Sequence, residues 1–376
     1  MRTWVAPGRV NIIGEHTDYN EGFVLPIALP LVVRCAAAAR ADGQVRVASR
    51  QRPGEPVLVA VSELAAQRER VPGWSRYPLG VVAGLVQRGH RIPGVDLDLD
   101  GAVPIGAGLS SSAALSCAVA IGLRDLFAPS LTDRALIDLA RAAENDYVGV
   151  PTGLLDQSAS MLCTAGHALF LDVRALAADP ATASRGVAHE QIPFDLDRFG
   201  LELLVIDTGQ PHDLVHSGYA ERRAHCARAA AELGVAALRD VASPALLDRI
   251  RDDVSRRRAR HVVTENARVL AVAEKLRRGA DPREIGPILT AGHVSLRDDF
   301  EVSTPALDAA VAAALTAGAY GARMVGAGFG GSAIALVDRE RTTAVVAAAR
   351  KHFAAVGFAD PRTFVVVPSA GAHSVN

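Results

Sequence analysis

Lysine is almost absent from this chain: Lys275 and Lys351 are the only two lysines among 376 residues. Neither of them lies in a glycine-rich segment. Their positions exclude a Walker A loop, the ATP-binding lysine of a protein kinase and a Schiff-base lysine in the N-terminal half. Any anionic ligand must therefore be bound by other groups.

Cysteine and long apolar runs are also scarce. The four cysteines lie far apart without a C-x-x-C pair, which argues against a zinc site and a disulfide framework. The longest apolar stretch, residues 23–39, is interrupted by Pro26, Pro30 and Arg34, and no signal peptide is evident. A net charge of -1 gives no reason to expect a nucleic acid or a membrane as partner. We expect a cytoplasmic protein.

Length and periodicity predict two α+β domains, because 376 residues are too many for one ordinary core. Strand patterns predominate up to about residue 100, the last of them at 95–100, and helices are expected at 110–126 and 132–146. The non-periodic stretch 175–189 is the best boundary, which gives domains 1–185 and 186–376. In the second domain we expect a strand at 201–206 and a majority of helices, at 217–233, 244–252, 255–278, 282–300 and 305–317.

The opening segment A-P-G-R-V-N-I-I-G-E-H-T-D-Y-N, residues 6–20, crowds charged side chains around a glycine. A purely structural strand would instead alternate apolar and polar residues. Carboxylates such as Glu15 and Asp18 are costly to bury beside Arg9 unless they are paired or face a polar ligand. A ligand rich in hydroxyl groups fits this segment.

The segment G-A-G-L-S-S-S-A-A-L, residues 106–115, predicts a tight turn that leads into a helix. Backbone N–H groups at the helix start, the helix dipole and the serine hydroxyls can together bind a phosphate without lysine. The alternative is an ordinary N-cap, although three consecutive serines exceed what a cap requires. If Glu144 faces Ser112 across this turn, their oxygens form a magnesium site; otherwise Glu144 is a solvated helix residue. Asp156 follows Pro151 and Gly153, so we expect its carboxylate on an irregular loop.

Two more segments leave alternatives open. The segment G-A-G-F-G-G, residues 326–331, either lets the backbone approach a ligand closely or is a flexible hairpin between two short strands. The run R-R-R-A-R-H, residues 256–261, resembles a basic patch, but Asp252, Asp253 and Glu265 surround it. We therefore expect a solvated helix face there.

These motifs occur in the order found in the GHMP kinases, which are named for galactokinase, homoserine kinase, mevalonate kinase and phosphomevalonate kinase. R-V-N-I-I-G-E-H-T-D-Y-N resembles the galactokinase signature, and G-V-P-T-G-L-L-D-Q, S-G-Y-A-E-R-R and G-A-R-M-V-G-A-G-F-G-G extend the resemblance over almost the whole chain. The resemblance implies an N-terminal ribosomal-protein-S5-domain-2-like α/β domain, a C-terminal ferredoxin-like α+β domain and an active site in the cleft between them. It also implies ATP-dependent phosphorylation of the anomeric hydroxyl of D-galactose, with Mg²⁺.

The resemblance assigns a role to each matching position. It implies that Asp156 is the catalytic base and that Arg9 stabilises the transition state. An arginine beside an aspartate favours the charged carboxylate, a weak base, so Asp156 alternatively acts by orientation. The implied sugar contacts are Glu15, His16, Thr17, Asp18, Gly153, Asp156 and Tyr219. The implied ATP contacts are Gly106, Ala107, Gly108, Leu109, Ser110, Ser111, Ser112 and, on the adenosine side, Ser49, with Mg²⁺ near Ser112 and Glu144.

The sequence leaves two other functions open. One is a sibling sugar-1-kinase that acts on N-acetylgalactosamine, galacturonate or arabinose. The other is a non-catalytic galactose sensor, which would show damaged catalytic motifs, whereas the motifs are intact here. Family members commonly carry a further segment before A-P-G-R, whereas this chain begins five residues before Ala6. Without that segment, a sheet edge or an apolar patch would be uncovered unless the fold compensates. We expect a monomer.

Overall fold

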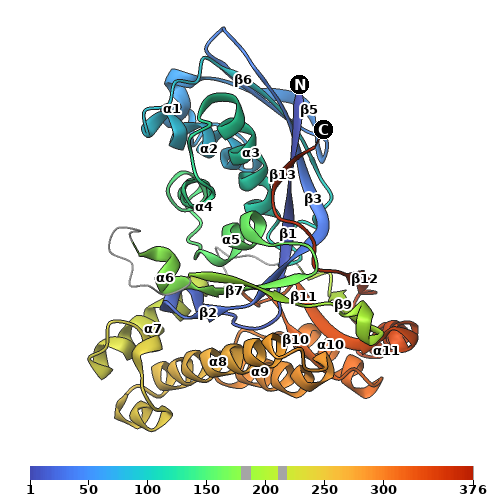
Figure 1. Ribbon diagram of the computed structural model, residues 1–376. Helices are drawn as coiled ribbons and strands as arrows, with labels where there is room; N and C mark the ends of the chain where they lie inside the picture. Colours follow the sequence, from blue (N-terminus) through green and yellow to red (C-terminus); the bar gives the residue numbers. More distant parts are fainter. Residues whose placement is uncertain (179–187, 211–217, 376) are drawn as a thin grey trace.

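The computed structural model describes residues 1–178, 188–210 and 218–375, and its strands form three sheets (Figure 1). The six-stranded sheet has the order β13-β1-β3-β6-β4-β5, the four-stranded sheet β10-β11-β9-β12 and the three-stranded sheet β2-β7-β8. The strands are β1 Arg2–Asn11, β2 Phe23–Val24, β3 Pro26–Ala39, β4 Gln44–Ser49, β5 Arg52–Ala60, β6 Val95–Gly101, β7 His167–Asp172, β8 His189–Pro193, β9 Leu201–Asp207, β10 Gly321–Met324, β11 Ser332–Asp338, β12 Arg362–Val366 and β13 His373–Val375.

Helices pack on these sheets and on one another. In the upper part of Figure 1, α3 crosses β1 and β3 and packs against α2 and α4, while α8 at the bottom contacts β2 and β8. The α-helices are α1 Leu64–Gln67, α2 Arg76–Gln87, α3 Ser111–Phe127, α4 Asp133–Ala142, α5 Leu155–Leu162, α6 Val173–Ala177, α7 Tyr219–Leu233, α8 Asp253–Arg277, α9 Gly286–Asp298, α10 Pro305–Thr316 and α11 Thr342–Ala355.

Alternation in the sequence explains the six-stranded sheet. Along β6 the apolar residues Val95, Leu97 and Leu99 are buried, and the intervening aspartates stay partly exposed. Two of these aspartates form ion pairs: Asp96 with Arg40, directly after β3, and Asp98 with Arg46 of β4. The strand expected at 95–100 is therefore confirmed, with one face in the core and one in water.

Three local expectations are corrected. The helix expected at 132–146 ends as an α-helix at Ala142 and continues as a π-helical turn, Ala143–Val148. The helix expected at 282–300 is divided into a 3-10 turn, Pro282–Ile285, and α9. Asp156 lies in the first turn of α5 rather than on a loop, because buried residues on both sides of it favour a short helix.

The run 256–261 is not a solvated helix face, which corrects a fourth expectation. It lies in α8, where Arg258 and His261 are buried, as is Glu265 one turn further on. The reason is that α8 has neighbours on several sides, since it contacts α7, α9, β2 and β8. No helix within the described ranges is long and apolar enough to cross a membrane.

Both ends of the chain reach the six-stranded sheet. Residues Thr3–Val5 of β1 pair with β13 on one side and with β3 on the other, so both edges of β1 are covered there. The predicted division at 185/186 lies outside the described residues and stays a prediction. The three-stranded sheet contains β7 from before this position and β8 from after it.

Candidate active site

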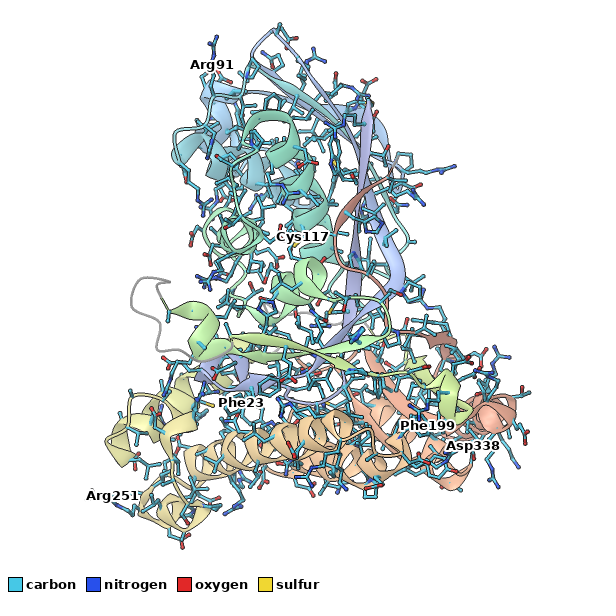
Figure 2. All side chains as sticks on the ribbon, in the orientation of Figure 1. Phe23, Arg91, Cys117, Phe199, Arg251 and Asp338 are labelled. Carbon is cyan, nitrogen blue, oxygen red and sulfur yellow. The ribbon has the colours of Figure 1, made fainter. Side chains whose placement is uncertain are left out.

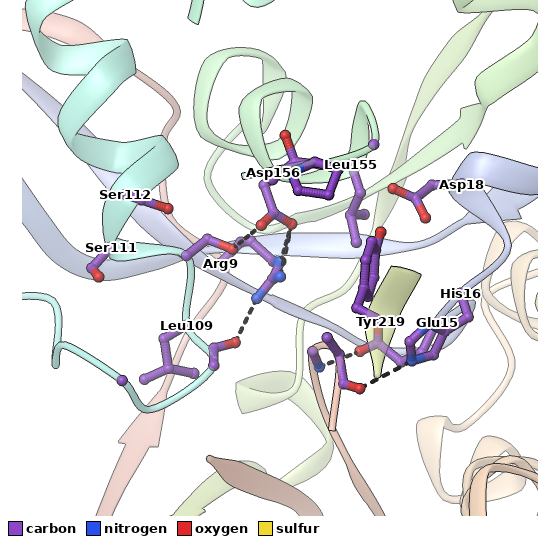
Figure 3. A pocket seen from close by; sticks show the side chains of 18 of the residues that line it. Arg9, Glu15, His16, Asp18, Leu109, Ser111, Ser112, Leu155, Asp156 and Tyr219 are labelled. Carbon is purple, nitrogen blue, oxygen red and sulfur yellow. Dashed lines mark hydrogen bonds and ion pairs between the residues drawn. The ribbon is translucent and has the colours of Figure 1, made fainter. Parts of the chain in front are cut away.

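A cavity of about 210 Å³ collects most of the side chains predicted to be functional (Figure 3). The predicted residues that line it are Arg9, Glu15, His16, Asp18, Gly106, Gly108, Leu109, Ser110, Ser111, Ser112, Gly153, Asp156 and Tyr219. The cavity is also lined by residues to which no role was assigned from the sequence: Tyr77, Pro151, Thr152, Leu155, Gly326 and Ala327. All of them except Tyr77 lie in the G-V-P-T-G-L-L-D-Q and G-A-G-F-G-G motifs, which were the available signal for them.

The centre of the cavity is a hydrogen-bonded group of three side chains (Figure 3). Arg9, on β1, donates from Nε to Oδ1 of Asp156 at 2.8 Å and pairs through its second guanidinium nitrogen at 2.7 Å. Its remaining nitrogen donates to the carbonyl of Gly108 at 2.7 Å. The hydroxyl of Ser110 donates to Oδ2 of Asp156 at 2.6 Å. Each oxygen of the Asp156 carboxylate therefore has a donor of its own.

The serine turn does not have the geometry of a simple helix cap. Ser110 precedes α3 with φ +57 in the left-handed region, and its side chain makes no capping hydrogen bond. The first backbone N–H groups of α3, from Ser111 onward, lack acceptors within the helix and lie at its positive end. Ser111 and Ser112 line the cavity beside them. The ordinary N-cap interpretation is thus wrong for Ser110.

The G-A-G-F-G-G segment joins β10 to β11 and packs against the serine turn. A Cβ atom added to Gly331 would lie 3.0 Å from the carbonyl oxygen of Ala107, and one added to Gly326 would lie 3.1 Å from that of Gly108. Ser332 also donates to the carbonyl of Ala107 at 2.8 Å. The two glycine-rich segments therefore need their glycines to approach each other closely.

Carboxylates line the other end of the cavity. Glu15 is buried and accepts hydrogen bonds from the amide of Asn11 at 3.1 Å and from the backbone N–H of Gly326 at 2.9 Å. Burial raises the pKa of Glu15, although the guanidinium groups of Arg323 and Arg9 oppose the shift. Burial and the charge of Asp156 raise the pKa of Asp18 to about 6. Each of these two carboxylates can accept further hydrogen bonds, which suits a ligand that offers hydroxyl groups.

Close packing fixes this carboxylate end. A Cβ atom on Gly153 would lie 1.7 Å from Oδ2 of Asp18, so any larger residue here would displace the Asp18 carboxylate. The buried ring of His16, with φ +65, lies 5.8 Å from the ring of Tyr219 and 4.6 Å from that of Phe300. Burial raises the pKa of Tyr219 well above its ordinary value, so its hydroxyl remains a donor.

Ser112 and Glu144 come together as expected from the sequence, with 3.3 Å between Ser112 Oγ and Glu144 Oε2. Glu144 is buried on the π-helical turn rather than solvated, and Gln157 donates to its other oxygen at 3.2 Å. Burial and the charge of Asp156 raise the pKa of Glu144 to about 8. A cation beside this carboxylate would favour its charged form.

Four predicted residues do not line the cavity: Glu144, which contacts the lining residue Ser112, and Thr17, Ala107 and Ser49. Thr17 is buried, and its hydroxyl donates to the carbonyl oxygens of Gly14 and Phe23. Ala107 is buried beneath the serine turn. Ser49 ends β4 and pairs with Leu99 in the sheet. Direct contacts of these residues with a substrate stay predictions.

Comparison with known proteins explains this arrangement. The model of the GHMP kinase N-terminal domain matches residues 76–164, the galactokinase galactose-binding signature matches residues 2–39, and the GHMP kinase C-terminal model matches residues 272–355. A galactokinase from Streptomyces coelicolor is 49% identical over 98% of this chain and 93% of its own length. The chain belongs to the galactokinase family. A galactokinase from Mycobacterium tuberculosis is 41% identical over 98% of this chain and 97% of its own.

Solved structures confirm the fold expected for a galactokinase. Lactococcus lactis galactokinase complexed with galactose superimposes with a TM-score of 0.90 at 32% identity, covering 100% of this chain and 95% of the other. A mevalonate kinase shares the fold at a TM-score of 0.68 and 16% identity, over 98% and 99% of the two chains. The predicted two-domain GHMP kinase fold and the prediction of an ATP-dependent sugar kinase are both confirmed.

Proposed function

We propose that this chain transfers the γ-phosphoryl group of ATP to the anomeric hydroxyl of D-galactose, giving α-D-galactose 1-phosphate and ADP. The observation that carries the proposal is the position of the Arg9–Asp156–Ser110 group. It lies in one cavity with a lysine-free helix start and a wall of carboxylates. The proposed anion site and the proposed polyol site thus share one cavity, as transfer of a phosphoryl group between their ligands requires.

The geometry supports a mechanism based on position and charge. The α3 N–H groups and serine hydroxyls would hold the ATP phosphates, and Arg9 would neutralise charge on the transferring group. Glu15, Asp18 and Tyr219 would hold the sugar hydroxyls, with the anomeric hydroxyl directed toward Asp156. Because both oxygens of Asp156 already accept hydrogen bonds, we propose that it mainly orients the hydroxyl, while the proton leaves late in a loose transition state.

Magnesium belongs to the same proposal. Ser112 and Glu144 offer hard oxygen donors, and the raised pKa of Glu144 reflects a buried carboxylate without enough positive charge around it. Within the described ranges, no group of three or more His, Cys, Asp or Glu side chains surrounds a metal position. Mg²⁺ does not require one, because water and phosphate oxygens complete its shell. When bound, the ion would neutralise charge on the phosphates.

We also propose that the chain divides into domains 1–185 and 186–376 and that the enzyme works as a monomer. The lining residues come from both sides of the division and from a single chain, which supports a site that is complete without a partner subunit.

An ADP-release assay with a panel of sugars tests the proposed function. We expect galactose to give the highest kcat/KM, ahead of N-acetylgalactosamine, galacturonate and arabinose. A preference for one of these three would identify a sibling kinase instead. No sugar-dependent turnover at all would favour the sensor, although the intact Arg9–Asp156 pair argues against that alternative.

A further inference from the structure

Residues 12–16 carry two of the cavity's polar side chains, Glu15 and His16. Their backbone is held by a buried ion pair that does not itself line the cavity. Glu265, on α8, accepts a hydrogen bond from the backbone N–H of Gly14 at 2.9 Å. Arg323, on β10, donates to the carbonyl oxygen of Ile12 at 2.9 Å and pairs with Glu265 at 3.2 Å. Both side chains of the pair are 0% exposed. Burial alone would raise the pKa of Glu265, but the charges of Arg323 and Arg268 lower it to about 2, so the carboxylate stays charged.

A second set of contacts holds the same segment. The Nε2 of His261, also on α8, lies 3.1 Å from the carbonyl oxygen of Glu15, and its Nδ1 lies 3.0 Å from the hydroxyl of Ser295. Since a carbonyl can only accept, Nε2 must carry the hydrogen. Burial lowers the pKa of His261 to about 4, so the ring is neutral in the assay range. Further along the chain, Asn266 accepts a hydrogen bond at 3.0 Å from the backbone N–H of Phe23 on β2, which is labelled in Figure 2.

The segment needs such support because its backbone is unusual. Gly14 has φ +107 and His16 has φ +65, so two of its positions lie in the left-handed region. For a histidine this conformation persists only where the surroundings impose it. None of the supporting side chains on α8 or β10 lines the cavity. They act on the ligand only through the backbone that they hold.

We propose that His261, Glu265 and Arg323 are positioning residues that set the place of Glu15 and His16 and thereby the affinity for the sugar. This inference rests on the proposed function, because it assigns residues 12–16 to the sugar end of the cavity. The start of α3 forms the phosphate end, and the G-A-G-F-G-G segment contacts both ends, since Gly331 packs against Ala107 and Gly326 donates to Glu15. Because His261, Glu265 and Arg323 bond directly to residues 12–16, loss of one of their contacts weakens sugar binding more than ATP binding.

Three substitutions at His261 test the proposal. His261→Phe keeps the ring packing against Phe300, at 4.7 Å between centroids, but removes the donor to Glu15. We expect the KM for galactose to rise about tenfold, with the KM for ATP and kcat changing less than about threefold, because one buried carbonyl loses its partner. His261→Gln, whose amide N–H reaches the position of Nε2, restores the KM. His261→Asn, whose amide reaches only the position of Nδ1, does not restore it.

Hydrogen exchange separates this proposal from the proposed function. In ligand-free protein, the peptide containing residues 12–16 should exchange faster in His261→Phe than in the wild type and His261→Gln. Equal rises in both KM values, failure of Gln to restore the KM, or unchanged exchange would each overturn the positioning role. A wild-type protein without galactose-dependent ADP release would instead overturn the proposed function. The exchange measurement would still decide whether His261 holds residues 12–16 in place.

Discussion

Substitution of Asp156 distinguishes orientation from proton abstraction more sharply than any other change. Asp156→Asn retains an oxygen that can accept from Arg9, and its amide group can still bond to the Ser110 hydroxyl. The geometry survives, but the basic carboxylate is lost. Asp156→Ala removes the geometry as well and leaves Arg9, only 5% exposed, without its partner.

We expect Asp156→Ala to lower kcat by about 10²–10³, the usual cost of removing a preorganised charged contact. We expect Asp156→Asn to lower kcat by less than about tenfold, because the hydroxyl remains oriented. Steady-state ADP release with saturating galactose and ATP measures both values. Urea unfolding is the control: loss of the largely buried ion-pair partner should destabilise Asp156→Ala by about 3 kcal/mol, and Asp156→Asn by less, because the amide still accepts a hydrogen bond from Arg9.

The result that refutes this reasoning is a matched loss. If Asp156→Asn loses as much as Asp156→Ala, within the range of about 10²–10⁴ that general base catalysis supplies, Asp156 abstracts the proton and orientation is secondary.

The remaining predictions concern other parts of the cavity. Gly153→Ala should raise the KM for galactose at least about tenfold and spare the KM for ATP, because its Cβ would lie 1.7 Å from Asp18; an unchanged galactose KM would contradict this. Because the pKa of Asp18 is about 6, kcat/KM for galactose should fall as pH drops below 6, and Asp18→Asn should remove that inflection. The same raised pKa favours folding below pH 3.8 and loses that contribution as pH rises through 6, so Asp18→Asn should raise the midpoint of urea unfolding at pH 8. EDTA should abolish turnover, and Glu144→Gln should raise the Mg²⁺ concentration for half-maximal rate by about tenfold or more; an unchanged Mg²⁺ requirement would exclude Glu144 as a ligand.

The local sequence pattern was sufficient to predict many helices and strands and to find the polar motifs. The strand expected at 201–206 is β9, Leu201–Asp207, and the helix expected at 255–278 is α8, Asp253–Arg277. Both follow from apolar spacing and from end signals close in sequence. The two glycine-rich segments were likewise visible, because turns depend on neighbouring residues.

Contacts between residues that are distant in the sequence could not be predicted from it. Arg258 and His261 belong to a charged run that is typical of a solvated face, and only the elements around α8 show that they are buried. The helical turn at Asp156 is too short for a periodicity to stand out. The contact of His261 with Glu15 joins positions 246 residues apart, and no pattern along the chain encodes such a pairing.

The pairing of β1 with β13 has a consequence for synthesis. β1 carries Arg9, yet its neighbour on one side consists of residues His373–Val375. On the ribosome, this edge of β1 stays open until residues 373–375 have emerged. Pairing of the two strands must therefore wait for synthesis of every residue between them, and deletion of residues 373–375 should impair folding around Thr3–Val5.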